Sequence, residues 1–201
     1  MKFIESLPKF TFTAASSTLL AAGIFLAGPG TAAADTVQKS DCSGDRCAPV
    51  VTATGIDANQ SAADTLNQEL GSDMAGYMTA EHVSHAREVV DAAKDRDLGK
   101  RAATIAIATV IVETHLNNYP GGDRDSVGLF QQRDHYGSHE ERLDPTWAAN
   151  AFYDELEFVY PDGSWDDEPI GDVSQDVQRS AYPYRYGYQA DDAGTIVDHL
   201  W

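Results

Sequence analysis

Glu113 is the residue of this chain that is best placed to do acid–base chemistry. It directly follows an apolar run at residues 105–112, which reads Ile-Ala-Ile-Ala-Thr-Val-Ile-Val. A carboxyl group at the edge of such a run loses hydration, and this loss disfavours the charged form and raises the pKa. A glutamic acid that stays protonated near neutral pH can serve as a general acid. The alternative is a solvated glutamate on the last turn of a helix, because charged side chains are mostly exposed.

A second group of polar residues follows Glu113 and completes a recognisable pattern. Residues 113–117 read Glu-Thr-His-Leu-Asn, and residues 128–131 read Gly-Leu-Phe-Gln, so that glutamate and glutamine stand 18 positions apart. This pattern resembles the signature of the soluble lytic transglycosylase and goose-type lysozyme superfamily, which is Glu-Ser-x-aromatic-or-Leu-Asn, a loop, and Gly-Leu-Met-Gln. Residues 122–133 also look like a lysozyme-like domain of secreted actinobacterial proteins. The resemblance covers roughly residues 79–201.

The resemblance implies both a fold and a reaction. The fold would be a lysozyme-like helical domain whose central buried helix ends at the catalytic glutamate. Glu113 would protonate the glycosidic oxygen between N-acetylmuramic acid and N-acetylglucosamine in peptidoglycan and then act as a base. In lytic transglycosylases the 6-hydroxyl of the sugar attacks, which requires one protein carboxyl. Hydrolysis would call for a second carboxylate, and Asp123 and Asp125 are the candidates, although both could simply form the turn.

The resemblance also implies residues that contact the substrate. Gln131 would face the cleft and hydrogen-bond the sugar, while Ser126 and Gly128 would let the loop approach closely. The family has an Ala-Tyr-Asn-Ala-Gly segment whose tyrosine lies near the glutamate, and Tyr182 in Ala-Tyr-Pro-Tyr is its nearest counterpart here. Tyr184 or Tyr186 could serve instead, because the Asn-Ala-Gly part is absent. The expected substrate-binding set is Gln131, Ser126, Gly128, Phe130, Tyr182 and Asp125.

The pattern of apolar and turn-forming residues predicts a mostly helical domain over residues 66–201. Thr79 could cap a helix that runs to about residue 97, and a helix over about 100–116 is apolar nearly all round, which implies burial on every side. The β-branched residues of this second segment also permit a strand. Asp144 and Pro145 form a helix start. The remaining helices are expected at about 126–132, 173–180 and 190–200.

The N-terminal segment has the pattern of a secretory signal peptide. Residues 19–27 are apolar, the Gly-Pro-Gly of 28–30 interrupts them, and Ala32–Ala34 offers a cleavage site. The apolar part is too short to span a membrane, although an uncleaved anchor is the alternative. We therefore expect a secreted or wall-associated protein with a signal peptide at 1–34 and a flexible acidic tail at 35–65. In an exported chain, Cys42 and Cys47 would close one small disulfide loop.

The charge of the chain excludes several classes of partner. The formal net charge is −18, and residues 1–34 carry a net +1, so the mature chain would carry −19. Nucleic-acid binding requires clustered Lys and Arg, and an anionic membrane would repel this protein. The charge is best interpreted as a means of solubility, although a positively charged partner or the role of an acidic enzyme inhibitor is an alternative.

We expect neither a metal nor a cofactor. His135 and His139 are four residues apart, but Tyr136 occupies the position where the zincin pattern requires glutamate. No Gly-x-Ser-x-Gly segment appears that would indicate a serine nucleophile. The main rival to a glycosidase or transglycosylase is a lysozyme-like module that binds wall glycan or a protein partner without cutting, since fold does not guarantee function. The sequence indicates no oligomeric state.

Overall fold

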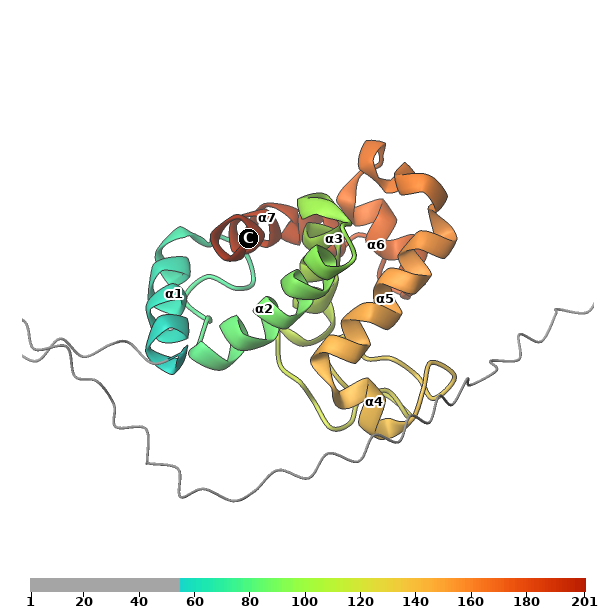
Figure 1. Cartoon of the computed structure of the whole chain (residues 1–201), viewed down its shortest axis with the longest axis horizontal. Coiled ribbons are helices and arrows are strands. Elements are labelled where there is room, and N and C mark those ends of the chain that lie inside the picture. The colour runs from blue at the N-terminus through green and yellow to red at the C-terminus, as the bar shows by residue number, and fades with distance from the viewer. Residues whose placement is uncertain (1–54) are drawn as a thin grey trace, which may run out of the picture. The chain divides into compact units, whose positions relative to one another are not determined.

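The computed structural model describes residues 55–201, and this part of the chain is mostly helical, as predicted (Figure 1). Its only β pairing among the described residues is an isolated antiparallel bridge between Val127 and Gln132. In order, the elements are α1 (Gly55–Glu69), α2 (Ala80–Asp95), α3 (Gly99–Thr114), α4 (His139–Leu143), α5 (Pro145–Val159), η1 (Pro161–Asp167), α6 (Ile170–Gln178), η2 (Tyr186–Gln189) and α7 (Ala190–Leu200).

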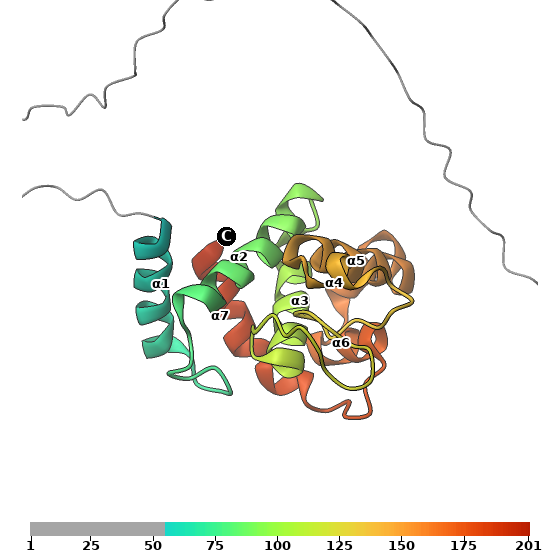
Figure 2. The ribbon, with the colours of Figure 1, turned by 90° about the horizontal axis from the view of Figure 1, so that it is seen from below.

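Helix α3 is the central element of the fold. It packs against α2, α5, α6 and α7, and both views show it between these helices (Figures 1 and 2). Almost every side chain from Ala102 to Thr114 is buried. The run is therefore a helix and not a strand, because neighbours on all sides supply the burial that outweighs the weak helix propensity of its β-branched residues. The predicted central buried helix is confirmed.

The helix starts that the sequence predicted are present. Thr79 caps α2 by accepting a hydrogen bond from the backbone N–H of His82, and Asp144 caps α5 by accepting one from Trp147 at 2.8 Å. Pro145 occupies the first position of α5, where its missing N–H costs nothing. After α5, left-handed backbone at Asp162 and Gly163 puts a kink near the start of η1.

Two local predictions differ from the structure. Residues 126–132 form a tight turn with two backbone hydrogen bonds between Val127 and Gln132, not a short helix. Helix α4 was not predicted, although Ser138 and Glu141 form a complete capping box at its start.

The ordered domain also begins earlier than residue 66. Helix α1 starts at Gly55, inside the stretch 35–65 that was predicted to be a flexible tail, and it packs against α2. The side chains of Ala62, Ala63 and Leu66 are buried in the core. The predicted signal peptide at 1–34, the rest of the tail and the Cys42–Cys47 disulfide lie outside the described residues. Among the helices of residues 55–201, none has the length and apolar character to cross a bilayer.

Candidate active site

Glu113 lies on the last turn of α3 and is partly buried. Loss of hydration raises the pKa of its carboxyl, while a hydrogen bond from Tyr186 and the positive charge of Arg185 oppose that rise. Burial is the largest of these effects, so the pKa stands above its ordinary value. The direction agrees with the sequence prediction, and a raised pKa favours the protonated form that a general acid needs.

Tyr186 is the direct partner of this carboxyl. Tyr186 is the first residue of η2, and its side chain is completely buried. Its hydroxyl donates a hydrogen bond of 2.6 Å to Glu113 Oε1. Burial and the neighbouring charge of Glu113 raise the pKa of Tyr186, so the phenol stays neutral and remains a donor. Tyr182, the first sequence candidate for this position, is instead largely exposed, and Tyr186 was one of the two alternatives.

The chain reverses sharply just after Glu113. His115 and Leu116 both adopt left-handed backbone conformations, with φ of 53° and 63°. Such conformations are costly for residues other than glycine and persist where the surroundings enforce them. The Asn117 side chain helps to hold this backbone conformation. Its amide nitrogen donates to Thr114 O at 2.9 Å, and its oxygen lies 3.1 Å from His82 Nε2. The end of α3, and with it Glu113, is thereby fixed in position.

Thr114 joins the two halves of the sequence pattern. Its hydroxyl lies 3.1 Å from Val110 O within α3 and 2.9 Å from Leu129 O in the following loop. This one hydroxyl therefore ties the last turn of α3 to the loop. The segment Gly128–Gln131 consequently lies against the helix end that carries Glu113.

Gly128 allows a close backbone approach, but to another part of the protein. Its φ is +80°, and a Cβ at this position would stand 2.0 Å from Arg142 O in α4. Its own N–H donates to Tyr119 O at 2.8 Å. The requirement for glycine therefore comes from the packing of the loop on α4 and not from contact with a ligand.

Gln131 and Ser126 are engaged within the loop itself. The amide nitrogen of Gln131 donates to Gly128 O at 3.1 Å, and its oxygen lies 3.3 Å from Ser126 Oγ. Ser126 is buried and donates to Asp123 O at 2.7 Å. Any side chain at Gly122 would collide with the Gln131 amide. These contacts use one N–H and one oxygen lone pair of the amide, and the remaining N–H and lone pair are not engaged by them.

Two other residues of the expected substrate-binding set have structural roles. Phe130 is buried and stacks on Phe152 with ring centroids 4.9 Å apart, so it belongs to the core and offers no surface to a sugar. Asp125 accepts from the backbone N–H of Asp134 at 2.7 Å and pairs with Arg133. The Asp134 hydrogen bond, aided by Arg133, lowers the pKa of Asp125 to about 2. Asp125 is therefore ionised at neutral pH and shapes the loop.

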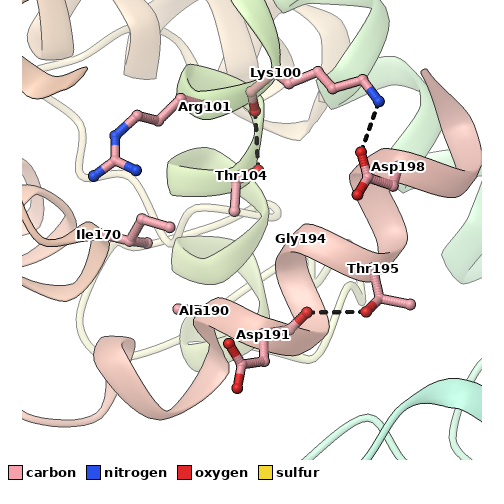
Figure 3. A pocket seen from close by; sticks show the side chains of 9 residues that line it. All are labelled: Lys100, Arg101, Thr104, Ile170, Ala190, Asp191, Gly194, Thr195 and Asp198. Carbon is pink, nitrogen blue, oxygen red and sulfur yellow. Dashed lines mark hydrogen bonds and ion pairs between the residues drawn. The ribbon is translucent and has the colours of Figure 1, made fainter.

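The structure also contains a pocket far from Glu113. A cavity of about 560 Å³ opens between the first turns of α3, the start of α6 and one side of α7 from Ala190 to Asp198, as Figure 3 shows. Lys100 on its rim pairs with Asp198 at 2.6 Å, and the Arg101 guanidinium bonds backbone carbonyls of Trp165 and Glu168. Lys100 and Glu113 stand thirteen positions apart on α3, which is roughly 20 Å along the helix. Asp191 is the remaining charged side chain of the lining, and this cavity does not include Glu113.

The two histidines considered as metal ligands do not form a site. His139 hydrogen-bonds Pro120 O at 3.2 Å, whereas the ring of His135 packs on Tyr136 with centroids 4.6 Å apart. Within residues 55–201, no group of three or more His, Cys, Asp or Glu side chains is arranged to hold a metal ion.

No protein-family model matches the chain, and no curated protein matches it either. The interpretation of the site therefore rests on its residues and their geometry.

Proposed function

We propose that this protein cleaves the glycan strand of peptidoglycan between N-acetylmuramic acid and N-acetylglucosamine, with Glu113 as the general acid and base. The observation that carries the proposal is the partly buried Glu113 carboxyl at the end of α3, with a raised pKa and the Tyr186 hydroxyl 2.6 Å away. A protonated carboxyl held in this way is what protonation of a glycosidic oxygen requires.

The first step transfers the Glu113 proton to the glycosidic oxygen while the bond between that oxygen and the anomeric carbon of muramic acid breaks. The sugar then carries positive charge, and the Glu113 carboxylate is left with a hydrogen bond from the Tyr186 hydroxyl. In the second step the oxygen of the attacking hydroxyl bonds to the anomeric carbon, and the Glu113 carboxylate takes the proton of that hydroxyl. The carboxyl is thereby returned to its starting state.

We favour attack by the 6-hydroxyl of the same muramic acid over attack by water. Hydrolysis normally uses a second carboxylate. Of the two candidates, Asp125 is committed to Arg133 and to the backbone of Asp134, and the side chain of Asp123 is 91% exposed beside Arg124. The transglycosylase route needs no such group and gives 1,6-anhydro ends. The predicted signal peptide would deliver the protein to the compartment where peptidoglycan lies.

The second candidate function is a module that binds wall glycan or a protein partner without cutting it. The internal hydrogen bonds of Gln131 favour this alternative, because they hold within the loop an amide that the family is expected to direct toward the sugar. Binding and cleavage are separable by experiment.

A digest of purified peptidoglycan tests the proposal. The native protein should release soluble muropeptides with anhydro ends, and Glu113→Gln should release none, because the amide cannot donate the proton. Glu140→Gln, at an exposed glutamate of α4, is the matched control and should act like the native protein. Reducing ends would select hydrolysis. Sedimentation with the wall but no release would favour the binding module, and release by Glu113→Gln would show that another group is the acid.

A further inference from the structure

The segment that carries Tyr186 has a tyrosine at every second position. Tyr186 is buried against Glu113. The other three are among the most exposed large side chains of the described residues: Tyr182 at 68%, Tyr184 at 82% and Tyr188 at 74%. Exposed aromatic rings that cluster in one short segment are a common mark of a binding surface.

The backbone of this segment is held at three points. Gln175 of α6 donates to Ser180 O at 3.0 Å at its start, and Ser72 donates to Tyr188 O at 3.2 Å at its end. The Tyr186 hydroxyl fixes the middle through Glu113. The three exposed rings therefore project from a backbone with defined hydrogen bonds.

Glycine contacts bring the same segment directly against α6. A Cβ at Gly171 would stand 2.7 Å from both the Cα and the N of Gly187, so the two backbones touch where η2 crosses the start of α6. The two segments could not approach so closely if residue 171 carried a side chain. This packing restrains the backbone between Tyr186 and Tyr188. The segment therefore has less conformational entropy to lose when a ligand binds.

The chemistry of these side chains suits a sugar polymer. A tyrosine ring offers an apolar face to the C–H groups of a pyranose, and its hydroxyl can donate to or accept from a sugar hydroxyl. A strand whose scissile bond reaches Glu113 must extend over the neighbouring surface on both sides. Tyr184 and Tyr188 each lie two residues from Tyr186, which contacts that carboxyl.

We propose that Tyr182, Tyr184 and Tyr188 form the surface on which the glycan strand stacks next to Glu113. This inference rests on the proposed function, because it takes the strand to be the substrate. Tyr182 was already expected to contact the substrate, and the inference adds Tyr184 and Tyr188. All three rings would hold the polymer and take no part in proton transfer.

Sedimentation with insoluble peptidoglycan tests the inference in a Glu113→Gln background, where the ligand stays intact. Combined Tyr182→Ala, Tyr184→Ala and Tyr188→Ala changes should weaken binding roughly tenfold, because the variant loses all three stacking surfaces; this corresponds to about 1.4 kcal/mol. The three Tyr→Phe changes keep the rings and should retain most of the binding. Phe158→Ala removes an equally exposed ring, at 78%, from the end of α5 and should change nothing.

The outcomes separate this inference from the proposed function. If the triple alanine variant binds as tightly as its parent while the native protein cleaves, the stacking surface is refuted and the proposed function stands. If the native protein does not cleave but binding depends on the three rings, the surface stands and cleavage is refuted. Pretreatment of the wall with protease identifies the ligand: loss of ring-dependent binding would point to a wall protein and overturn the glycan assignment.

Unchanged circular dichroism of the triple variant would establish that it folds. If it does not fold, Tyr184→Ala alone, at the most exposed of the three rings, should still weaken binding measurably, and unchanged binding would overturn the inference.

Discussion

At the scale of single residues, two opposing effects set the proton affinity of Glu113. Burial raises its pKa, because the charged form loses hydration, and the Tyr186 hydroxyl lowers it, because that hydroxyl donates to the carboxylate. The proposed reaction requires this group first to give up a proton and then to take one back. The hydrogen bond moderates the rise, so one group can serve both as acid and as base.

Removal of the Tyr186 hydroxyl should therefore shift the pH dependence upward. Native activity should fall on the alkaline side as Glu113 loses its proton. In Tyr186→Phe the hydrogen bond that lowers the Glu113 pKa is gone, so the pKa rises further and the alkaline limb moves to higher pH, while the maximal rate falls. A pH–rate profile of muropeptide release measures both changes.

Tyr153→Phe is the matched control for this prediction. Tyr153 is also a buried tyrosine, and its hydroxyl donates to Val89 O at 3.0 Å, away from Glu113. Its loss should cost stability by about 1 kcal/mol, as for a typical buried hydrogen bond, and leave the pH profile in place. An alkaline limb that moves to lower pH in Tyr186→Phe would contradict the assigned role of this hydroxyl.

The sequence identified Glu113 but could not select its partner. The carboxyl follows a long apolar run, and that local signal predicts both its position and the direction of its pKa shift. The choice of Tyr186 over Tyr182 depends on how the segment after α6 folds back across the end of α3. No pattern in alternating tyrosines encodes that path, so the contact becomes visible only in three dimensions.

At the scale of elements, one hydroxyl connects α3 to the loop that follows it. Thr114→Val keeps the shape of the side chain and removes the donor, which leaves the buried Leu129 carbonyl without this partner. We expect a loss of about 1–3 kcal/mol in the free energy of unfolding and a lower cleavage rate, since the loop loses its tie to the Glu113 helix. Urea unfolding measures the first effect. Thr114→Ser retains the hydroxyl and should stay close to native; equal losses in both variants would exclude the hydrogen bond as the cause.

The packing of the loop on α4 gives a second prediction at this scale. Gly128→Ala places a Cβ on a residue with left-handed backbone, and this Cβ would also collide with Arg142 O. Gly76 is left-handed too, with φ of +70°, but a Cβ there would meet no atom within 4 Å. The backbone penalty, about 1–2 kcal/mol, should appear in both variants. The collision should add a further ~1–3 kcal/mol in Gly128→Ala alone. Chemical denaturation of both proteins compares them, and equal destabilisation would show that the loop can move away from α4.

Elements with a periodic pattern or a strong cap were predictable, and those defined by tertiary contacts were not. Helix α3 follows from its all-round apolar run, and α5 from Asp144 and Pro145. The turn at 126–132 depends on left-handed Gly128 and Gln131 and on side-chain hydrogen bonds that a periodicity analysis does not detect. For α1, the spacing of Ala63, Leu66 and Leu70 was a usable signal that its polar surroundings obscured.

At the scale of the whole molecule, the net charge of −18 opposes the proposed substrate. Peptidoglycan is itself anionic, so long-range repulsion should slow the approach of the strand even where the contacts at Glu113 are favourable. The exposed tyrosines offer uncharged contacts, and these are insensitive to that repulsion once the strand is bound. A protein that must meet a like-charged polymer would be expected to combine such contacts with an environment in which salt screens the repulsion.

Salt should therefore strengthen the interaction, contrary to the usual behaviour of charged complexes. Between about 0.01 M and 0.15 M salt the screening length falls from about 30 Å to about 8 Å, so the repulsion between protein and wall should largely disappear. Binding of Glu113→Gln to purified peptidoglycan, measured by sedimentation, should tighten over this range. Binding to a neutral chitin oligosaccharide should stay constant, because no repulsion exists to be screened. Weaker peptidoglycan binding at the higher salt would instead mean that the few cationic side chains, Arg185 next to Glu113 among them, dominate the encounter.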